Sequence, residues 1–340
     1  MSAAKTSPIR FGVNFLPNAP AETLRWVQVA EEVGFDIAGI ADSQSLYRDV
    51  YMCLGWCATE TRRVRLGPRV INPLTRHPAI AASAAATLEE MAPGRTMLGI
   101  GTGDSAVLNL GLKPSTQALL AEYVRTVRQL LETGEAEWQG RHCRLTWWSG
   151  SIPIYLAASG PKMLALAGEI ADGVIINTGL TPEIIRDSID HVRRGAERAG
   201  RSLSEIDMWW LPLTNLRENQ TDAFEEIAMT LASAGSHLSR FTTTGKHIPP
   251  DLYDAVVELG HRYRTDQHDK PDSQNRELIK ELGLFDYLAN RFAVAGTVED
   301  CVEKLNKAID AGARQFWMSI HFDHKEEFLR KWADVIRTYQ

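Results

Sequence analysis

Residues 63–92 read RVRLGPRVINPLTRHPAIAASAAATLEEMA. They contain a short apolar run at 64–70, a polar elbow at 68–73 and an alanine-rich stretch at 77–91. This order predicts a strand, a tight turn and a long helix, because the apolar spacing changes at a proline-bounded elbow. In an α/β barrel such an elbow lies at the carboxyl end of a strand, where these folds build their active sites.

The same unit recurs along the rest of the chain. Apolar runs predict buried strands at residues 10–14, 37–41, 64–70, 96–101, 153–158, 173–177, 206–213 and 315–320. Segments with helical spacing or end signals predict helices at 20–32, 51–58, 77–91, 115–132, 161–170, 182–199, 298–311 and 325–338. The alternation predicts the α/β class and a parallel (β/α)8 TIM barrel, and we expect one domain over residues 1–340.

Two segments depart from this alternation. Residues 135–148, with Gln139-Gly140 inside, predict a small hairpin or an extended excursion. Residues 221–290 show helical patterns and no clear strand, and they are very polar over 261–274. We interpret 221–290 as a helical insertion between strands seven and eight, which would cover the mouth of the barrel or supply an oligomer contact.

Composition excludes several classes of protein. The net charge of −6 argues against nucleic acid or an anionic membrane as the main partner. Neither a secretory signal nor a run of about 18 apolar residues is present, so we expect a cytoplasmic protein with no membrane span. Cys53 and Cys57 lie one helical turn apart with no matching second pair, which favours buried thiols over a metal site.

The barrel rule selects candidate site residues by position alone. They are the residues that follow the predicted strands: Asn14, Asp42, Ser43, 69–72, 102–104, Ser159, Gly160, 177–179 and 319–321. The chain contains no nucleophile elbow, zinc-protease motif, phosphate-binding P-loop or paired carboxylates at helical spacing. We therefore expect a cofactor to supply the difficult chemistry.

The turn at Gly160-Pro161 opens a predicted helix with proline in its first turn. Free amides and the helix dipole there suit a phosphate or a carboxylate, and Lys162 adds a cation. The alternative is an ordinary strand-to-helix turn. Thr178-Gly179 provides a second small turn after the next strand.

Two carboxylates are candidates for proton transfer. Asp104 follows the glycine-rich run 99–103, whose spacing differs from the Rossmann fingerprint, and it either exchanges a proton or caps a turn. Asp42 ends an apolar strand, so it bonds either a ligand or the amides of the next loop. Several tryptophans near barrel elements belong either to the core or to an aromatic-lined pocket.

Segments spread over nearly the whole chain resemble the bacterial luciferase-like superfamily, with the closest likeness to its methylenetetrahydromethanopterin reductase branch. They are FGVNFLPN at 11–18, VAEEVGFD at 29–36, RDVY at 48–51, LGPRVINPLTRHPAIAASAAATLEE at 66–90, LGIGTGDS at 98–105, IYLAASGPKMLALAGEIADGVIIN at 154–177 and FAVAGTVED at 292–300. The resemblance implies a (β/α)8 barrel with a flavin-like ring across the strand ends.

The resemblance also assigns site residues. It places a non-prolyl cis peptide at Arg69-Val70, backing the ring, and it makes Asp104 a proton-transfer candidate together with Asp42 and Ser43. The residues expected to bind the cofactor ring and its phosphate-bearing chain are Arg69, Val70, Asn72, Thr102, Ser159, Gly160, Pro161, Lys162, Thr178 and Gly179. No metal is expected.

Two residues depart from the family pattern. Many deazaflavin-dependent relatives carry Asp-His after strand two, whereas this chain has Asp42-Ser43, and a serine is a poor base near neutral pH. Arg69 stands where a small residue is common, so it either crowds the ring or binds an anionic group.

Three functions follow from the resemblance. The first is an oxidoreductase that uses coenzyme F420 to transfer a hydride to or from a small organic substrate. The second is an FMN-dependent monooxygenase supplied by a separate flavin or deazaflavin reductase. The third is a non-catalytic flavin-binding protein. We also expect a homodimer or a higher homo-oligomer, formed through the second and third barrel helices.

Overall fold

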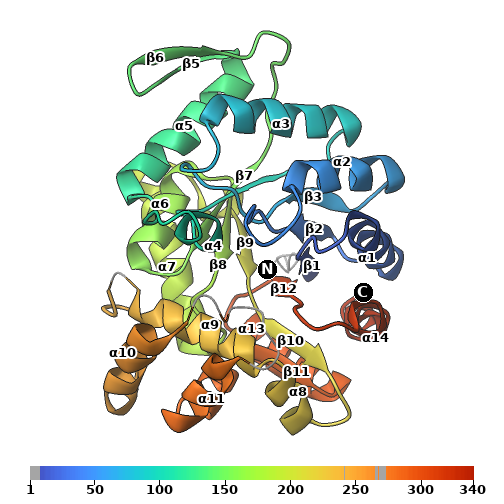
Figure 1. Ribbon diagram of the computed structural model, residues 1–340, viewed down its shortest axis with the longest axis vertical. Helices are drawn as coiled ribbons and strands as arrows, with labels where there is room; N and C mark the ends of the chain where they lie inside the picture. The colour runs from blue at the N-terminus through green and yellow to red at the C-terminus, as the bar shows by residue number, and fades with distance from the viewer. Residues whose placement is uncertain (1–7, 241, 265–266, 268–272) are drawn as a thin grey trace, which may run out of the picture.

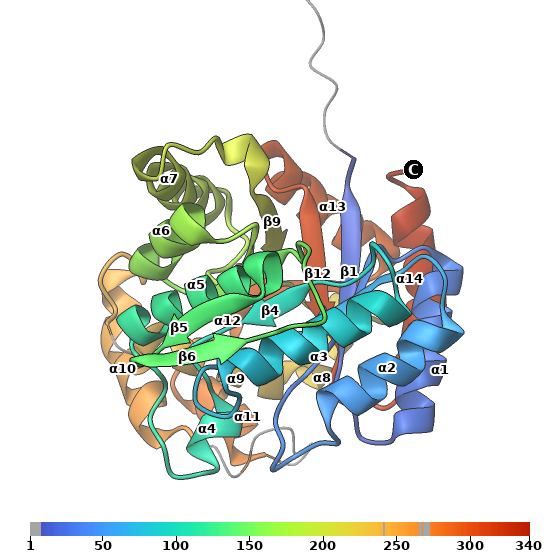
Figure 2. The same ribbon diagram turned by 90° about the horizontal axis from the view of Figure 1, so that it is seen from above.

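The computed structural model describes residues 8–240, 242–264, 267 and 273–340. Part of the polar stretch 261–274 and residues 1–7 lie outside the described residues. Parallel strands form a barrel with helices around it, and β1 and β12 lie side by side near its centre in Figure 2. The TIM-barrel prediction is confirmed.

The barrel strands follow a continuous pairing order, β3-β2-β1-β12-β9-β8-β7-β4. They are β1 (Arg10–Phe15), β2 (Ile37–Ile40), β3 (Arg65–Pro68), β4 (Leu98–Ile100), β7 (Ile154–Ala158), β8 (Gly173–Ile176), β9 (Asp207–Trp210) and β12 (Gln315–Ser319). Two isolated parallel bridges, Leu66 to Thr96 and Ile71 to Ile100, connect the ends of this order. The last barrel strand pairs with the first, so the sheet joins the two ends of the sequence.

The outer helices follow the strands in turn. They are α1 (Pro20–Val33), α2 (Val50–Glu60), α3 (Pro78–Met91), α5 (Gln117–Thr133), α6 (Pro161–Ile170), α7 (Pro182–Arg198), α13 (Val298–Asp310) and α14 (Lys325–Arg337). Helix α1 illustrates how the sequence sets their bounds, since proline occupies its first turn and Gly34 ends it in the left-handed region at φ 99°. Short helices α4 (Ser105–Leu108) and η1 (Leu203–Glu205) complete the connections.

The excursion at 135–148 contains the predicted hairpin. Strands β5 (Glu135–Trp138) and β6 (Arg141–Arg144) pair antiparallel. Gln139 and Gly140 both have positive φ, 51° and 73°, as a two-residue hairpin turn requires. The hairpin projects beside α5 at the top of Figure 1.

The prediction of one strand over 206–213 is wrong in its bounds. Strand β9 ends at Trp210, and a new strand, β10 (Leu213–Leu216), begins after Pro212. Proline has no N–H to donate, so it interrupts the ladder. Strand β10 pairs with β11 (Ala293–Gly296), which the sequence patterns did not predict.

The segment between these two strands is helical, as predicted for 221–290. It contains α8 (Gln220–Glu226), α9 (Ala228–Ser239), η2 (Pro250–Leu252), α10 (Tyr253–Arg262), α11 (Gln274–Glu281) and α12 (Phe285–Phe292). These helices share a hydrophobic cluster that is separate from the main core, and α9, α10 and α11 lie together at the bottom of Figure 1.

The barrel interior is filled by large side chains that pack against glycines. Trp317 is fully buried, and an added Cβ at Gly12 or Gly39 would come within 2.9 Å or 2.7 Å of its ring. Trp209, Tyr155 and several aliphatic side chains belong to the same cluster. A cavity remains above this packing, at the carboxyl ends of the strands.

Candidate functional site

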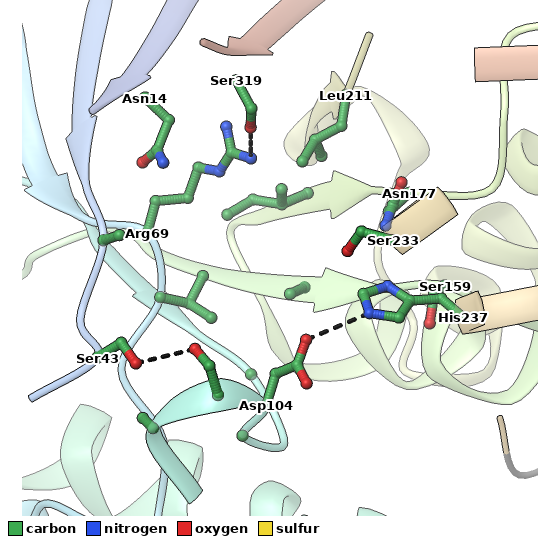
Figure 3. A pocket seen from close by; sticks show the side chains of 18 of the residues that line it. Asn14, Ser43, Arg69, Asp104, Ser159, Asn177, Leu211, Ser233, His237 and Ser319 are labelled. Carbon is green, nitrogen blue, oxygen red and sulfur yellow. Dashed lines mark hydrogen bonds and ion pairs between the residues drawn. The ribbon is translucent and has the colours of Figure 1, made fainter. Parts of the chain in front are cut away.

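A cavity of about 350 Å³ lies at the carboxyl ends of the barrel strands. Its wall takes residues from the ends of most barrel strands and from one face of α9, where Thr230, Ser233, Ala234 and His237 follow helical spacing. The volume is within the range of small-molecule sites. Figure 3 shows polar side chains from strands and from α9 facing the same space.

Small residues and Val70 form the floor of this cavity. The Arg69-Val70 peptide bond is cis, as the family resemblance implied. An added Cβ at Gly101 would lie 2.8 Å from Val70 Cγ2, so only glycine leaves room for this side chain. The floor is formed by Val70, Gly101 and Ala157, whose small side chains give the cavity a mostly apolar surface there.

Asp104 forms the most polar part of the wall. Its Oδ1 accepts a 2.8 Å hydrogen bond from Arg240, and its Oδ2 lies 3.2 Å from His237 Nε2 (Figure 3). Burial alone would raise the pKa of Asp104, but His237 and Arg240 together hold it well below its ordinary value. Asp104 is therefore a carboxylate at neutral pH.

The sequence suggested that Asp42 bonds either a ligand or the amides of the next loop, but its partner is the side chain of Arg76. Arg76 donates to both of its oxygens, at 2.8 and 3.0 Å, and also to Asp49 at 3.1 Å. The Asp42 side chain is only 3% exposed, and the Arg76 guanidinium lies over the Tyr51 ring. Asp42 therefore acts as a buried counter-ion that ties the loop after β2 to the segment that follows the elbow, and this placement argues against a proton-transfer role.

Ser43 and Asn72 are also engaged within the protein. Ser43 Oγ lies 2.8 Å from Ser105 Oγ, which links the loops after β2 and β4. Asn72 Oδ1 accepts from the amides of Leu74 and Thr75, both at 3.0 Å, so its side chain closes the elbow turn. Both residues border the cavity, yet their polar atoms hold the wall together.

A smaller pocket of about 10 Å³ lies beside the turn before α6. Ser159 lines both pockets, which makes them neighbours, and Gly160, Pro161 and Thr178 line the smaller one. Two buried cations also line it, Lys246 at 7% and Arg291 at 2% exposure.

These two cations bind neutral groups. Lys246 Nζ donates to three backbone carbonyls at the end of α9 and just beyond it. Arg291 donates to the Thr178 carbonyl, at 2.9 and 2.7 Å, to the His247 carbonyl and to the Tyr287 hydroxyl. Burial lowers the pKa of Lys246 to about 8, with further lowering by Arg291 and Arg240. Neither cation has a carboxylate partner among the described residues.

Two predicted cofactor residues line neither pocket. Lys162 is exposed, so it is not the cation that stands beside the turn. Gly179 has φ 120° and packs against Arg291, where an added Cβ would lie 2.7 Å from Cγ. Its small size allows Arg291 to reach the Thr178 carbonyl. The predicted residues that line the main cavity are Asn14, Asp42, Ser43, Arg69, Val70, Asn72, Thr102, Gly103, Asp104, Ser159, Asn177, Ser319 and His321.

Comparison with known families agrees with this architecture. The model of the family described as "luciferase-like monooxygenase" matches residues 2–315, which is most of the chain. The chain belongs to the luciferase-like monooxygenase family. The resemblance identified in the sequence is confirmed.

Relatives within this luciferase-like family carry related names. The 5,10-methylenetetrahydromethanopterin reductase of Methanolobus tindarius is 30% identical and aligns over 90% of this chain and 92% of its own length. The F420-dependent glucose-6-phosphate dehydrogenase of Nakamurella multipartita is 36% identical over 97% of this chain and 96% of its own. A solved structure, the coenzyme F420-dependent tetrahydromethanopterin reductase from Methanopyrus kandleri, has a TM-score of 0.77 at 27% identity, covering 98% of this chain and all of that one.

Sequence reasoning missed several site residues of this luciferase-like chain. His237 and Arg240 come from the end of α9, and Lys246 and Arg291 come from later in the insertion or its last helix. One signal was available, because small residues and a histidine recur along one face of 230–237. The two buried cations carried no such signal, since their partners are mostly backbone carbonyls, which no side-chain pattern in the sequence marks.

Other expectations have simple structural outcomes. Trp209, Trp210 and Trp317 are at most 1% exposed and belong to the core, and no tryptophan lines the main cavity. Within the described ranges, no helix is long and apolar enough to cross a membrane. The same residues contain no cluster of three metal-binding side chains.

Proposed function

We propose that the protein is an F420-dependent oxidoreductase that transfers a hydride between the deazaflavin ring and a small organic substrate. The observation that carries the proposal is the pairing of two neighbouring pockets, which share Ser159. The larger has an apolar floor, and the smaller contains two buried cations that lack carboxylate partners among the described residues. A flat ring with an anionic chain matches both parts. The relatives named as F420-dependent favour the deazaflavin over FMN.

The floor of the cavity would hold the ring. Val70 would back its central part, while Gly101 and Ala157 allow close approach. Thr102 borders the same space and would contact the ring edge. When bound, the deazaflavin supplies the hydride donor or acceptor, and the protein supplies position and electrostatics.

The smaller pocket would hold the phosphate-bearing chain. A buried cation that meets only dipoles is costly, and an anion would offset that cost. Lys246 and Arg291 would supply the charge, and Ser159, Gly160 and Thr178 would supply hydrogen-bond donors. The pocket admits little more than one water as it stands, so Lys246 would have to move from the end of α9 toward the phosphate.

The Asp104–His237 pair would handle the proton. Asp104 is held ionised, so it can orient the imidazole and stabilise its charged form. The imidazole borders the cavity and can give a proton to the substrate or take one from it. In this arrangement α9 would supply a histidine in place of the one that many relatives carry after strand two, where this chain has Ser43.

A binding titration separates the proposed function from its alternatives. The purified protein would be titrated with F420 and with FMN, following deazaflavin fluorescence and flavin absorbance. We expect saturable F420 binding and much weaker FMN binding. Tight FMN binding without F420 binding would instead support the monooxygenase that depends on a separate reductase.

Binding alone leaves the non-catalytic alternative open, so the second step measures hydride transfer. The F420 complex would be screened against alcohols, aldehydes and hydroxy acids while the deazaflavin absorbance is recorded. Turnover of any class supports the enzyme. Saturable binding with no turnover across the panel would favour a non-catalytic flavin-binding protein.

We also propose a homodimer that packs through α2 and α3. Large apolar side chains are exposed there, with Met52 at 78%, Ile80 at 59% and Trp56 at 44%. Light scattering after size-exclusion chromatography should give a dimer. Ile80→Glu should shift it toward the monomer, whereas Leu112→Glu, on another exposed apolar site, should not.

We infer a reducing, cytoplasmic location from the thiols. All four cysteines are free, and Cys53 and Cys57 are buried one turn apart on α2 without pairing. Burial raises the pKa of the Cys57 thiol to about 12, which keeps it inert. Thiol titration in native and denatured protein should give few reactive groups before unfolding and four after it.

A further inference from the structure

Charges on the cavity wall are paired, with one exception. Asp42 binds Arg76, which stands behind the wall, and Asp104 binds Arg240. Arg69 also lines the cavity, and it has no carboxylate partner among the described residues. The wall therefore carries one positive charge without a counter-charge.

The Arg69 guanidinium lies over the core of the barrel. Its carbon is 5.4 Å from the centre of the Trp317 ring. Nη2 donates to Ser319 Oγ at 2.6 Å, while Nη1 makes only long contacts, both 3.4 Å, to the carbonyls of Trp317 and Met318. A guanidinium has more N–H donors than these contacts use. Burial lowers the pKa of Arg69 to about 9, so it is still a cation at neutral pH.

Asn14 stands beside Arg69 with an unpartnered side chain. It is 5% exposed, lines the cavity, and its Oδ1 has no hydrogen-bond partner. Asn14 Oδ1 and Arg69 Cβ both lie within 3.0 Å of the point where a Cβ of Gly39 would be. In Figure 3 the carboxamide of Asn14 and the hydroxyl of Ser319 flank the arginine on the same side of the cavity.

Leaving such groups unpaired in the apo protein is costly unless a ligand uses them. Arg69 is partly buried, and a partly buried charge without a counter-charge reduces stability. A planar guanidinium between a hydroxyl and a carboxamide is complementary to a singly charged, planar oxyanion. Such a group would satisfy the arginine, and the Ser319 hydroxyl and the Asn14 Nδ2 amide could each donate to it, whereas Asn14 Oδ1 is an acceptor that the oxyanion leaves unpaired.

We propose that Arg69, Ser319 and Asn14 form a subsite for the carboxylate of an anionic organic substrate. The subsite lies next to Val70, so it would hold the substrate against the ring that the proposed function places there. This inference deepens the proposed function and rests on it. It makes Arg69 a substrate-binding residue rather than part of the cofactor site.

The test compares acids with their neutral amides. Benzoate and cyclohexanecarboxylate, with benzamide and cyclohexanecarboxamide as matched controls, would be titrated calorimetrically into the F420-bound protein and the cofactor-free protein. A charge-assisted hydrogen bond predicts that each acid binds about tenfold to hundredfold more tightly than its amide. Arg69→Met should reduce that preference to within about twofold, and Arg69→Lys should retain part of it.

Arg240→Met is the matched control, because Arg240 lines the same cavity but is paired with Asp104. It should leave the preference for acids in place. The ¹⁵N signal of the Arg69 Nε, assigned by its loss in Arg69→Met, should shift with benzoate and not with benzamide. This measurement in the unsubstituted protein decides the question even when Arg69→Met fails to fold.

Two results would overturn the subsite. One is equal binding of acid and amide by the unsubstituted protein, and the other is an Arg69→Met variant that keeps the preference and loses F420 affinity instead. Failure of the proposed function looks different. The protein would then show no F420 binding, while acids would still bind the cofactor-free form through Arg69.

Discussion

The Asp42–Arg76 pair offers the sharpest test of how the site is held together. Arg76→Met keeps a long apolar side chain and removes the donors that bind both Asp42 oxygens. The Asp42 carboxylate, whose side chain is 3% exposed, would then be buried without a counter-charge. The segment after the elbow would also lose the hydrogen bond from Arg76 to Asp49 and the contact of the guanidinium with the Tyr51 ring.

The magnitude follows from burial. Removing one partner of a buried ion pair costs about 3–5 kcal/mol. The Arg76 side chain is 17% exposed, so some water reaches the pair, and we expect the lower end, about 3 kcal/mol. In the double variant Asp42→Asn with Arg76→Met the stranded charge is gone. We expect it to be more stable than Arg76→Met alone, with a coupling of about 1–3 kcal/mol.

The assay is urea-induced unfolding at pH 7, followed by tryptophan fluorescence, for the parent, both single variants and the double variant. Arg193→Met is the control, because Arg193 pairs with Asp190 and Glu197 on the exposed face of α7. Its cost should stay below about 1 kcal/mol. Should Arg76→Met cost no more than this control, or should the coupling vanish, the buried-pair reasoning is refuted.

Three further predictions concern the cavity. His237→Gln should lower kcat of the F420-dependent reaction about 10²–10⁴-fold with a smaller change in F420 affinity, measured by steady-state and binding assays. Gly101→Ala should push Val70 into the cavity, since the new Cβ would lie 2.8 Å from it, and should weaken F420 binding about tenfold or more. Asp104→Asn should cost about 1 kcal/mol of folding stability at pH 7, and this difference from the parent should shrink as the pH falls. The pKa of Asp104 is lowered in the folded protein, so its carboxylate stabilises the fold above the ordinary carboxyl pKa. That stabilisation is lost as the pH falls through the lowered value.

Each of these has a result that counts against it. Unchanged kcat in His237→Gln would remove the imidazole from the proton path, and undiminished F420 affinity in Gly101→Ala would move the ring elsewhere. For Asp104→Asn, the stability difference from the parent should be measured by urea unfolding at pH 7, 5 and 3. A difference that grows toward acid would contradict the assigned direction of the pKa shift.

The barrel elements were predictable because the pattern of apolar residues within each element indicates which of its side chains are buried. Strands β2 and β8 are buried over their whole length, and their sequences, IAGI and GVII, show it directly. The break after β9 and the short pair β10 and β11 were not predictable in this way. Their pairing depends on contacts between residues about eighty positions apart, such as Leu213 with Ala293.

The site was predictable in location and much less so in chemistry. Strand ends placed Asp42, Asp104 and Arg69 on one cavity wall. Their partners decide what each can do, and those partners are distant in sequence. Arg240 lies 136 positions from Asp104, and Arg76 lies 34 from Asp42. Local pattern carries no information on such pairs, so it could not show that Asp42 is bound by Arg76 and Asp104 by Arg240.

The separate hydrophobic cluster of the insertion has a consequence for divergence and engineering. Helices α9 to α12 pack on one another through Leu231, Leu259, Leu288 and their neighbours. Changes on the cavity face of α9 therefore need no repacking of the barrel, because the two cores are distinct. We expect that grafting the segment between β10 and β11 between barrels of this family would exchange the cavity face of α9 together with His237, Lys246 and Arg291, while Val70, Gly101 and Ala157 on the barrel would stay the same.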